Sequence, residues 1–393
     1  MLKTETLKLQ HPTNIKKMNI PSNTIRESSR LLSRIRYTRA TLPVLTHVLA
    51  TLDATGITFA VTDLDRWLET RTEVPPGPAE PESFLIPPDA MKALKKADKN
   101  TDTTITCKGT RKQRELRIVM VCGGITVESR HPTLDVSEFP QCPVIDQQET
   151  RIPARTMESL ATVAGCASTD ATRYVLNGVF FTPEDGGKLV ATDGKRLGCA
   201  PAEVPPEPFI LPNQSAGVLA HPDFIRRDAD VRIQKIEETE WISIRSGNHL
   251  LTSKTINGTY PNYQQVIPHY APELVTISPD HRASIIKWLR SLSDTQTEIN
   301  LSWEKKNHLT LTQRSASDTS AVLRVIAEIE GTPPLIAFRP RYLADALEIG
   351  STLCLSDEMT PGICRHPSGR FCVVMPMRVT AATAAATQDA NAA

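Results

Sequence analysis

A pattern that recurs three times limits the possible folds of this chain more than any other feature of its sequence. Thr62-Asp63, Thr192-Asp193 and Ser317-Asp318 each end an apolar, strand-like run. Ten residues after each aspartate stands a glutamate, and prolines, a short apolar strand and a helix-like segment follow in every copy. The aspartates are 130 and 125 residues apart. Self-similarity at this period predicts three tandem copies of one domain.

The elements within each copy indicate the fold class. A helix is predicted at the front of each copy, over 26–36, 155–165 and 281–292, and a second helix over 89–96, 213–220 and 341–348. Strand-like runs outnumber the helices, and the turn signal Glu184-Asp185-Gly186-Gly187 predicts a hairpin. We therefore expect an α+β fold in which each copy has two helices packed on antiparallel sheets.

The copies and their flanks predict the domain organisation. Residues 1–24 are polar and aperiodic, which is typical of a flexible N-terminal arm. Residues 381–393 are of low complexity and are predicted to form a disordered tail. Between them we expect domain I over 25–147, domain II over 148–270 and domain III over 271–380, because proline-containing connections lie near both internal boundaries.

Composition argues against several classes of protein. The apolar runs are shorter than the roughly 18 residues that a membrane span needs. The start Met1-Leu2-Lys3-Thr4-Glu5 carries charges where a secretory signal has an apolar core, so a cytoplasmic protein is predicted. The eight cysteines form no CxxC pair and the nine histidines no HExxH motif. Reduced thiols, no metal site and no cofactor are therefore expected.

Motifs for catalysis are missing from the sequence. Gly194-Lys195 is similar to part of a phosphate-binding loop, but Leu189 stands where that loop needs glycine and Arg196 where it needs serine or threonine. Asp63 and Asp193 hold the same place in two copies. We expect them to bind the backbone of their own turns, and not to pair around a metal as in a nuclease. The chain is predicted not to be an enzyme.

Basic residues gather on corresponding helices, although the formal net charge is only +1. Arginines follow the first helix of copy one at intervals of four, and lysines crowd its second helix. On a lone helix such a stripe is ordinary solvated surface. Its repetition predicts a positive surface that can hold phosphates without reading base sequence. The candidate DNA-binding residues are Arg26, Arg30, Arg34, Arg39, Lys92, Lys95, Lys96, Arg173, Tyr174, Arg282, Lys287 and Arg339.

Several motifs, in order and spacing, resemble one protein family. They are Thr172-Arg173-Tyr174-Val175-Leu176-Asn177-Gly178, Ala191-Thr192-Asp193-Gly194-Lys195-Arg196-Leu197, Tyr260-Pro261-Asn262-Tyr263 and the ending Val373-Val374-Met375-Pro376-Met377-Arg378. The resemblance extends over residues 25 to 380 or so. The chain resembles the β subunit of bacterial DNA polymerase III, the β sliding clamp, as a divergent member.

The resemblance implies a processivity factor. In that family two chains join head to tail as a homodimer, and their domains close a ring with helices inside and sheets outside, so that one chain forms half of the ring. Double-stranded DNA passes through the hole, and the ring tethers the DNA polymerase III α subunit and other clamp-motif proteins. An ATP-dependent clamp loader opens the ring. The basic helices would then face the DNA.

A peptide-binding groove between domains II and III is also implied. Branched aliphatic side chains and proline suit a firm apolar pocket, and methionine adapts to different ligands. Without the resemblance, 373–377 would be interpreted as an ordinary buried edge strand. By matching position the groove residues are Leu176, Thr192, Gly194, Lys195, Arg196, Leu197, Pro261, Gln265, Val266, Val373, Val374, Met375, Pro376, Met377 and Arg378.

Some positions depart from the family's pattern. Gln265 stands where a basic residue is usual, and Lys195 where histidine is common. Asp170 and Asn213-Gln214 replace polar or basic residues that approach DNA. These departures leave a second hypothesis open, a divergent clamp paralogue that acts mainly as a peptide-binding protein with altered partners and no DNA loading. Oligomeric mass and loading on circular DNA distinguish the two.

Overall fold

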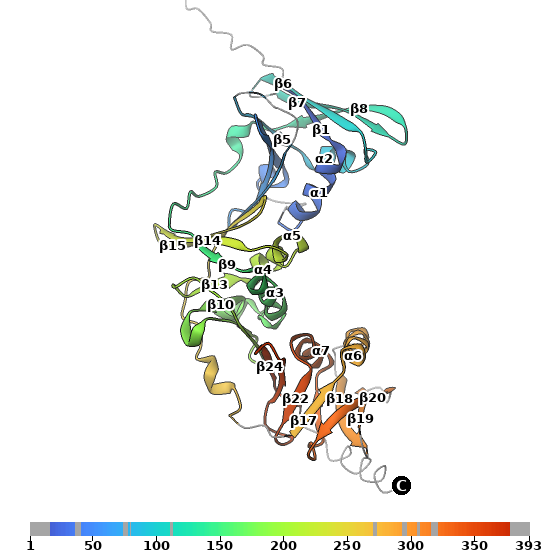
Figure 1. Ribbon diagram of the computed structural model, residues 1–393. Helices are drawn as coiled ribbons and strands as arrows, with labels where there is room; N and C mark the ends of the chain where they lie inside the picture. Colours follow the sequence, from blue (N-terminus) through green and yellow to red (C-terminus); the bar gives the residue numbers. More distant parts are fainter. Residues whose placement is uncertain are drawn as a thin grey trace, which may run out of the picture. The chain divides into compact units, whose positions relative to one another are not determined.

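The computed structural model describes residues 16–35, 41–73, 78, 80–110, 113–269, 273–292, 297–304, 307–315 and 321–377 (Figure 1). The chain divides into two compact units. Unit 1 contains residues 1–148, 232–234 and 241–254, and unit 2 contains residues 149–231, 235–240 and 255–393. Among the described residues, no helix combines the length and the apolar character that crossing a bilayer requires.

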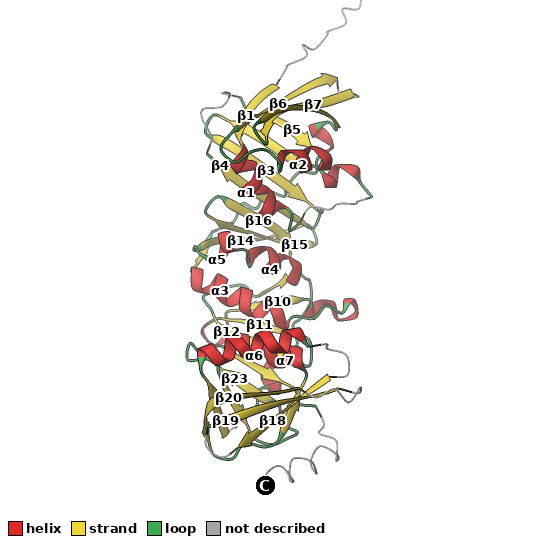
Figure 2. Ribbon diagram, turned by 90° about the vertical axis from the view of Figure 1, so that its right-hand side faces the viewer, coloured by secondary structure: helices red, strands yellow, loops and turns green. Residues whose placement is uncertain are grey.

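Unit 1 contains two antiparallel sheets with a pair of helices. One sheet has the strand order β1-β6-β7-β8, and the other runs β5-β2-β3-β4-β16-β15 within this unit. The bounds are β1 (Lys16–Pro21), α1 (Ser22–Leu32), β2 (Val48–Asp53), β3 (Gly56–Thr62), β4 (Arg66–Thr72), β5 (Glu82–Ile86), α2 (Pro88–Leu94), β6 (Asp102–Thr110), β7 (Gln113–Cys122), β8 (Ile125–Thr133), β15 (Thr239–Ser246) and β16 (His249–Lys254). In Figure 2, α1 and α2 lie on one side of these strands.

Unit 2 is organised around one twelve-stranded antiparallel sheet, in the order β13-β10-β11-β12-β24-β23-β22-β17-β20-β19-β18-β21. Its helices lie together on one side of the strands in Figure 2. The bounds are β9 (Thr150–Ile152), α3 (Ala154–Val163), β10 (Gly178–Thr182), β11 (Lys188–Thr192), β12 (Arg196–Pro201), β13 (Phe209–Pro212), α4 (Asn213–Leu219), α5 (Pro222–Ile225), β14 (Ala229–Ile236), β17 (Glu273–Ile277), α6 (Pro279–Ser291), β18 (Thr297–Glu304), β19 (His308–Ser315), β20 (Ala321–Glu330), β21 (Ile336–Phe338), α7 (Pro340–Ile349), β22 (Thr352–Leu355), β23 (Gly362–Arg365) and β24 (Phe371–Val374).

Short 3₁₀ helices join several of these elements. They are η1 (Pro43–Thr46), η2 (Val136–Glu138), η3 (Ala164–Cys166), η4 (Ala171–Leu176), η5 (Glu184–Gly186) and η6 (Tyr263–Val266). η5 forms the turn between β10 and β11, whose antiparallel pairing confirms the hairpin predicted around Gly186-Gly187.

The order of the elements confirms three copies of one α+β domain. Each copy runs strand, helix, four strands, helix, three strands, and the second copy adds only α5. The four-strand sets also share one spatial order, β5-β2-β3-β4, β13-β10-β11-β12 and β21-β18-β19-β20. The predicted domain limits at 147/148 and 270/271 fall between β8 and β9 and between β16 and β17.

Strand pairing between copies explains why the chain has two compact units although it has three copies. β12 of the second copy pairs with β24 of the third, which makes one continuous sheet in unit 2. β4 of the first copy pairs with β16 of the second, which places 241–254 in unit 1. We call these two pairings the β4–β16 seam and the β12–β24 seam.

The predicted flexible arm over 1–24 is wrong for residues 16–24. Lys16–Pro21 forms β1, which pairs with β6 from Lys16 opposite Cys107 to Pro21 opposite Asp102. Met18 and Ile20 are buried, because they alternate along the strand and point to the core. Residues 22–24 already belong to α1. Residues 1–15 and the predicted tail over 381–393 lie outside the described residues.

The six predicted helices are found in place but differ at their ends, and the structure adds the short helix α5, which was not predicted. α2, α6 and α7 begin at Pro88, Pro279 and Pro340, one or two residues before the predicted starts. Proline suits the first helical position, because its φ is already helical and its missing N–H would have no partner there. α1 ends at Leu32, four residues before the predicted end.

Candidate functional site

The turn between β11 and β12 is built by its own side chains. The Thr192 hydroxyl accepts a hydrogen bond from Gly194 N at 3.0 Å, and Asp193 Oδ1 accepts from Lys195 N and Arg196 N at 2.8 and 3.0 Å. Gly194 has φ +82°, and a Cβ there would lie 2.9 Å from Arg173 Nη1, so glycine suits the position. Local hydrogen bonds therefore fix this turn.

The equivalent turn of the first copy is built the same way. Asp63 Oδ1 accepts from the backbone N–H groups of Asp65 and Arg66 at 3.2 and 2.7 Å. Asp63 and Asp193 are thus turn residues, as predicted. Among the described residues, no three His, Cys, Asp or Glu side chains are grouped to hold an ion.

A buried ion network anchors the β11–β12 turn to the helices of the third copy. Arg196 contacts Asp345 of α7, which also binds Arg290 of α6, and the side chains of Arg196 and Asp345 are only 2% and 7% exposed. Arg196 also donates to the Gly165 carbonyl at 2.7 Å. Removing one partner of a buried pair leaves an uncompensated charge, so the network makes the position of the turn depend on α7.

Asp345 and Arg290 were not predicted as part of any site. The sequence contains one signal for Asp345, which is an acid among the apolar residues Leu343, Ala344, Ala346 and Leu347 of α7. A charge on a buried helix face needs a partner. Its partner lies in a different copy of the repeat, so sequence spacing could not identify it.

An apolar surface lies next to this turn, on the β12–β24 seam. Leu197 pairs with Val373, and Met375 N donates to the Lys195 carbonyl at 2.9 Å. Leu176, Leu197 and Val373 belong to one hydrophobic cluster, together with Tyr260 and Tyr263 of the connector that follows β16. The structure thus brings together predicted groove residues from three separate stretches of unit 2.

The predicted groove residues divide into supporting and exposed ones. Arg196, Leu197, Val373 and Val374 are buried, so they form the base of this surface. The buried-strand interpretation therefore holds for Val373 and Val374, although β24 is an interior strand and not an edge. Val266 and Met375 are 52% and 43% exposed. We call the surface formed by the exposed or partly exposed predicted residues the groove surface; they are Leu176, Thr192, Gly194, Lys195, Gln265, Val266, Met375, Pro376 and Met377.

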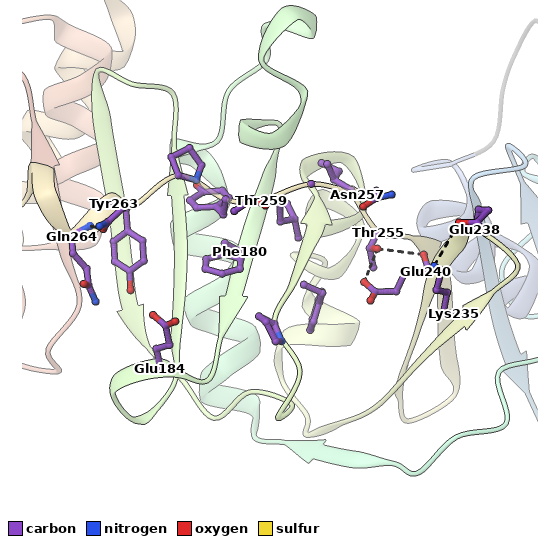
Figure 3. Close-up of a pocket in the computed structure, with 18 residues that line it drawn as sticks. Phe180, Glu184, Lys235, Glu238, Glu240, Thr255, Asn257, Thr259, Tyr263 and Gln264 are labelled. Carbon is purple, nitrogen blue, oxygen red and sulfur yellow. Dashed lines mark hydrogen bonds and ion pairs between the residues drawn. The ribbon is translucent and has the colours of Figure 1, made fainter.

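Two predicted groove residues are not included in this set, although Pro261 is itself exposed. Pro261 lines a larger cavity of about 750 Å³ on the connector between β16 and η6 (Figure 3). Arg378 lies outside the described residues. The cavity has an aromatic wall, in which Phe180 stacks on Tyr260 at 4.8 Å, and a polar end where Thr255 donates to Glu240 at 2.8 Å. Burial raises the pKa of Tyr260. Sequence reasoning missed this cavity, since its walls come from strands far apart in sequence.

The predicted DNA-binding residues of unit 1 lie on α1, on α2 and just after them. Arg30, Arg34, Lys92, Lys95 and Lys96 are exposed. Arg26 is half-buried and donates to the Ala97 carbonyl just beyond α2. Part of the arginine stripe therefore holds the two helices together, and the rest is exposed cation. Arg39 lies outside the described residues.

The predicted DNA-binding residues of unit 2 are divided between two places. Lys287 is exposed on α6, where Arg282 donates to the Gly350 carbonyl at 3.4 Å. Arg173 and Arg339, by contrast, line one cavity of about 290 Å³ together with Arg196, which follows the turn between β11 and β12. Tyr174 is 58% exposed on η4 beside Arg173.

All eight cysteines are free thiols, as the spacing predicted. Cys199 lies on β12 under the groove surface, and burial raises its pKa to about 11. Burial raises the pKa of Cys142 to about 11 as well. These thiols are protonated at neutral pH and serve as small apolar side chains.

Comparisons with known proteins agree with this architecture. Residues 151–262 match the family model for the central domain of the DNA polymerase III beta subunit. The beta sliding clamp of Caulobacter vibrioides is 27% identical over 364 residues, covering 87% of this chain and 94% of that protein. The beta sliding clamp of Haemophilus influenzae is 28% identical over 369 residues, covering 87% of this chain and 94% of that protein.

Solved structures show the same fold. A crystal structure of the C. crescentus beta sliding clamp matches with a TM-score of 0.76 at 23% identity, covering 94% of this chain and 100% of that one. The DNA polymerase sliding clamp of Bacillus subtilis matches with a TM-score of 0.75 at 21% identity, covering 93% of this chain and 99% of that one. The threefold repeat and the similarity to clamps along almost its whole length make this chain similar to the bacterial DNA polymerase III β subunit, as a divergent relative.

Proposed function

We propose that this chain is a DNA sliding clamp, a processivity factor that closes around double-stranded DNA as a homodimeric ring. The observation that carries the proposal is the threefold repeat of one domain in a chain that matches beta sliding clamps over 94% of their length. Three domains per chain allow two chains to close a ring of six. The role is topological and not enzymatic, since a closed ring holds DNA without a chemical step.

Cations on the helices supply the contact with DNA. The exposed residues Arg30, Arg34, Lys92 and Lys96 of unit 1 and Lys287 of unit 2 can reach phosphate oxygens, which are the same at every base pair. Binding that rests on phosphate neutralisation is independent of sequence and falls steeply with salt. Such contacts let the ring slide, whereas contacts with base edges would stop it.

The groove surface supplies the contact with partners. The exposed Met375 lies beside a turn that local hydrogen bonds fix, since its N–H binds the Lys195 carbonyl at 2.9 Å, and Val266 is a second exposed apolar side chain. Methionine adapts to different apolar partners, and a firm surface lowers the entropic cost of binding a short peptide. The partners proposed are the DNA polymerase III α subunit and other proteins with a short clamp-binding motif. An ATP-dependent clamp loader would open the ring, because the sequence has no nucleotide-binding motif of its own.

Solution mass and topological retention test this function. The purified full-length chain should have the mass of a dimer, and after loading it should remain on nicked circular DNA. Linearising the circle should release it within minutes, because the ring can then slide off an end. A chain that stays monomeric at micromolar concentration, or that leaves circular and linear DNA equally fast, would contradict the proposal.

A further inference from the structure

The cavity of about 750 Å³ on the connector between β16 and η6 takes no part in the proposed contacts with DNA or with the groove surface. We call it the connector cavity. Its walls come from β10, η5, β13, the turn between β14 and β15, and residues 255–264, and every lining residue belongs to unit 2. Sites for small ligands span roughly 300–1,000 Å³. The connector cavity can therefore hold a few residues of an extended peptide.

The lining of the connector cavity carries three glutamates and one lysine, which give a formal charge of −2. Lys235 lies 3.6 Å from Glu238 and compensates that one carboxylate. Glu240 accepts a hydrogen bond from the Thr255 hydroxyl at 2.8 Å, which leaves its charge in place. Among the described residues, neither Glu184 nor Glu240 forms an ion pair. Two carboxylates of the lining therefore remain uncompensated.

The cation near the lining does not cancel this charge. Lys188, which lies near Tyr263 of the lining, is already paired with Asp185 at 2.7 Å. Two further glutamates, Glu207 and Glu237, stand next to lining residues in the sequence and are exposed. A negative cavity repels the phosphates of DNA and attracts a ligand with positive charge.

The two uncompensated carboxylates lie at opposite ends of the connector cavity. In Figure 3 Glu184 lies at one end and Glu240 at the other, and Phe180 lies between them. Within the described part of the chain, these carboxylates do not belong to any group of three side chains that could hold a metal ion. An extended ligand with several cations fits this arrangement better than a single ion.

The wall between these ends is aromatic. Phe180 stacks on Tyr260 with ring centres 4.8 Å apart and planes 8° from parallel, and Phe180 is only half-buried. A planar guanidinium can lie on the face of an aromatic ring while its N–H groups bind a carboxylate. Arginine is therefore the side chain that this wall and its carboxylates suit best.

A buried hydroxyl at the Glu184 end lacks a hydrogen bond. Tyr263 is 6% exposed, and its hydroxyl has no partner among the described residues, although it points toward Glu184 in Figure 3. An unpaired buried hydroxyl costs free energy. A guanidinium has five N–H donors, so one that binds the exposed Glu184 can also donate to this oxygen once Glu184 moves slightly.

The connector cavity and the groove surface share one short element. Gln264 of η6 lines the cavity, and the next two residues, Gln265 and Val266, belong to the groove surface. A peptide whose apolar side chains contact the groove surface therefore needs only a few more residues to reach the cavity.

We infer that the connector cavity binds an arginine-bearing segment that flanks the apolar anchors of a partner peptide. This inference rests on the proposed function and specifies the chemistry of the partner. It separates the two ligands of the chain by charge, because cations on the helices hold DNA and carboxylates in the cavity hold protein.

A pair of matched peptides tests the inference. One has an apolar core of leucine, alanine, leucine and phenylalanine, flanked on each side by glycine, arginine, serine and arginine and blocked at both ends. In the other, the uncharged citrulline replaces every arginine. Both flanks carry arginine, so the result does not depend on the direction in which the peptide binds.

Binding of each peptide to the full-length chain is measured by calorimetry at 50 and 500 mM salt. The arginine peptide should bind roughly tenfold more tightly at low salt, because charge-assisted hydrogen bonds are the stronger ones. High salt should reduce this preference, since the carboxylates are partly exposed.

Variants of the chain assign the preference to the cavity. In Glu184→Gln/Glu240→Gln the preference should fall below about threefold, while the citrulline peptide binds as before. The matched control is Glu328→Gln/Glu330→Gln, which removes the same charge from exposed residues of β20 in the same unit and should keep the preference. Circular dichroism confirms that each variant is folded.

The remaining outcomes overturn the inference in distinguishable ways. Equal affinity of the unaltered chain for the two peptides shows that the cavity does not bind arginine, and leaves the proposed function intact. A preference that Glu184→Gln/Glu240→Gln keeps in full places the contact elsewhere on the chain. A changed solution mass in this variant assigns the cavity to a second copy of the chain. If neither peptide binds, the groove surface is not a peptide site, and the inference falls with that part of the proposed function.

Discussion

The β4–β16 seam of unit 1 and the β12–β24 seam of unit 2 have the same backbone. Each begins at a Thr-Asp turn, and each joins one copy of the repeat to the next by antiparallel pairing. Lys254 N donates to the Asp65 carbonyl at 2.9 Å in the first seam, and Met375 N donates to the Lys195 carbonyl at 2.9 Å in the second. The repeat therefore produces two equivalent places at which a binding surface could form.

The side chains make these two places different. In the first seam Lys254 Nζ binds Asp65 at 2.7 Å and lies 5.4 Å from the ring centre of Trp241, which meets Trp67 edge to face at 5.5 Å. In the second seam, Met375 stands at the equivalent position and is 43% exposed. One seam is covered by its own charged and aromatic side chains, and the other leaves an apolar surface uncovered. A few side chains, and not the fold, thus separate a structural joint from a binding site.

The arginines that follow the two turns, Arg66 and Arg196, also differ in their ion-pair partners. Arg66 pairs with Asp63 of its own turn at 2.5 Å. Arg196 lies 3.5 Å from Asp193 of its own turn and also contacts Asp345 on a helix of the next copy. The turn beside the groove surface is thus tied to α6 and α7, whereas the turn of the first copy depends mainly on itself.

The largest effect is expected from Asp345→Ala, which should lower the stability of unit 2 by about 3–5 kcal/mol because it removes the closer of the two carboxylates that compensate the buried Arg196. Urea unfolding followed by fluorescence measures the change. Glu348→Ala is the matched control, since Glu348 binds the same Arg290 at 3.0 Å but is 47% exposed, and it should cost less than about 1 kcal/mol. Equal effects of the two substitutions would mean that the network does not anchor the turn.

Substitution of the two turn aspartates is expected to affect the two seams differently. Asp63→Ala and Asp193→Ala each leave two backbone N–H groups without an acceptor, at a cost of about 1–3 kcal/mol. Only Asp193→Ala should also weaken peptide binding, because only its turn adjoins an exposed apolar surface. Peptide titration by calorimetry measures this difference. A loss of affinity in Asp63→Ala as well would contradict the assignment of binding to one seam.

Met375→Glu should reduce peptide affinity at least about tenfold, by placing a charge where the peptide's apolar groups are expected. Stability should change by less than about 0.5 kcal/mol, since the side chain is exposed. The fractions of folded chain and of bound peptide are followed in the same samples. Normal affinity in this variant would remove Met375 from the binding surface.

Lys254→Ala should have a small effect, about 0.2–1 kcal/mol of stability, because Lys254 and Asp65 are 39% and 68% exposed. The effect should shrink in high salt, and peptide affinity should be unchanged. Thermal unfolding at 50 and 500 mM salt measures it. A loss of stability above about 2 kcal/mol would be more than a surface ion pair contributes. It would show that the Lys254–Asp65 pair has a structural role in the first seam.

The two units are expected to differ least in the properties of their thiols, which are the pH dependence that the thiols give to stability and the rate at which they are labelled. Burial raises the pKa of Cys142 in unit 1 and of Cys199 in unit 2 to about 11. The folded chain then binds more protons than the unfolded one between pH 9 and 11, so stability should fall as the pH rises through this range. At pH 8 both native thiols should react with iodoacetamide much more slowly than in urea. Mass spectrometry of the labelled peptides measures both rates, and rapid native labelling of either thiol would contradict its burial.

Local chemistry explains what could be predicted from the sequence. The Thr-Asp turns, the hairpin at Gly186-Gly187 and the helices that begin at or near proline depend on residues a few positions apart, and each formed as expected or within a few residues of it. The strand β1 was missed because its partner β6 lies about 85 residues further on. Its alternation of Met18 and Ile20 is too short to distinguish a strand from a polar arm.

The candidate site was predictable only in part for a similar reason. The resemblance named the residues of the groove surface, and several of them meet at the β12–β24 seam. It could not separate the exposed Met375 from the buried Val373 and Val374 beside it, because exposure depends on both neighbouring strands. Nor could it place Arg173 with Arg339, since the pocket they share is formed by two copies of the repeat.

The repeat, the helix and strand content and the turns follow from the amino-acid sequence alone, because they depend on periodicity and on hydrogen bonds within a few residues. Tertiary structure alone decided which strands join the copies, which charges are buried together and which of two equivalent seams stays uncovered. Those outcomes depend on side chains more than a hundred residues apart, such as Arg196 and Asp345. Burial then makes their contact far stronger than the same contact would be in water.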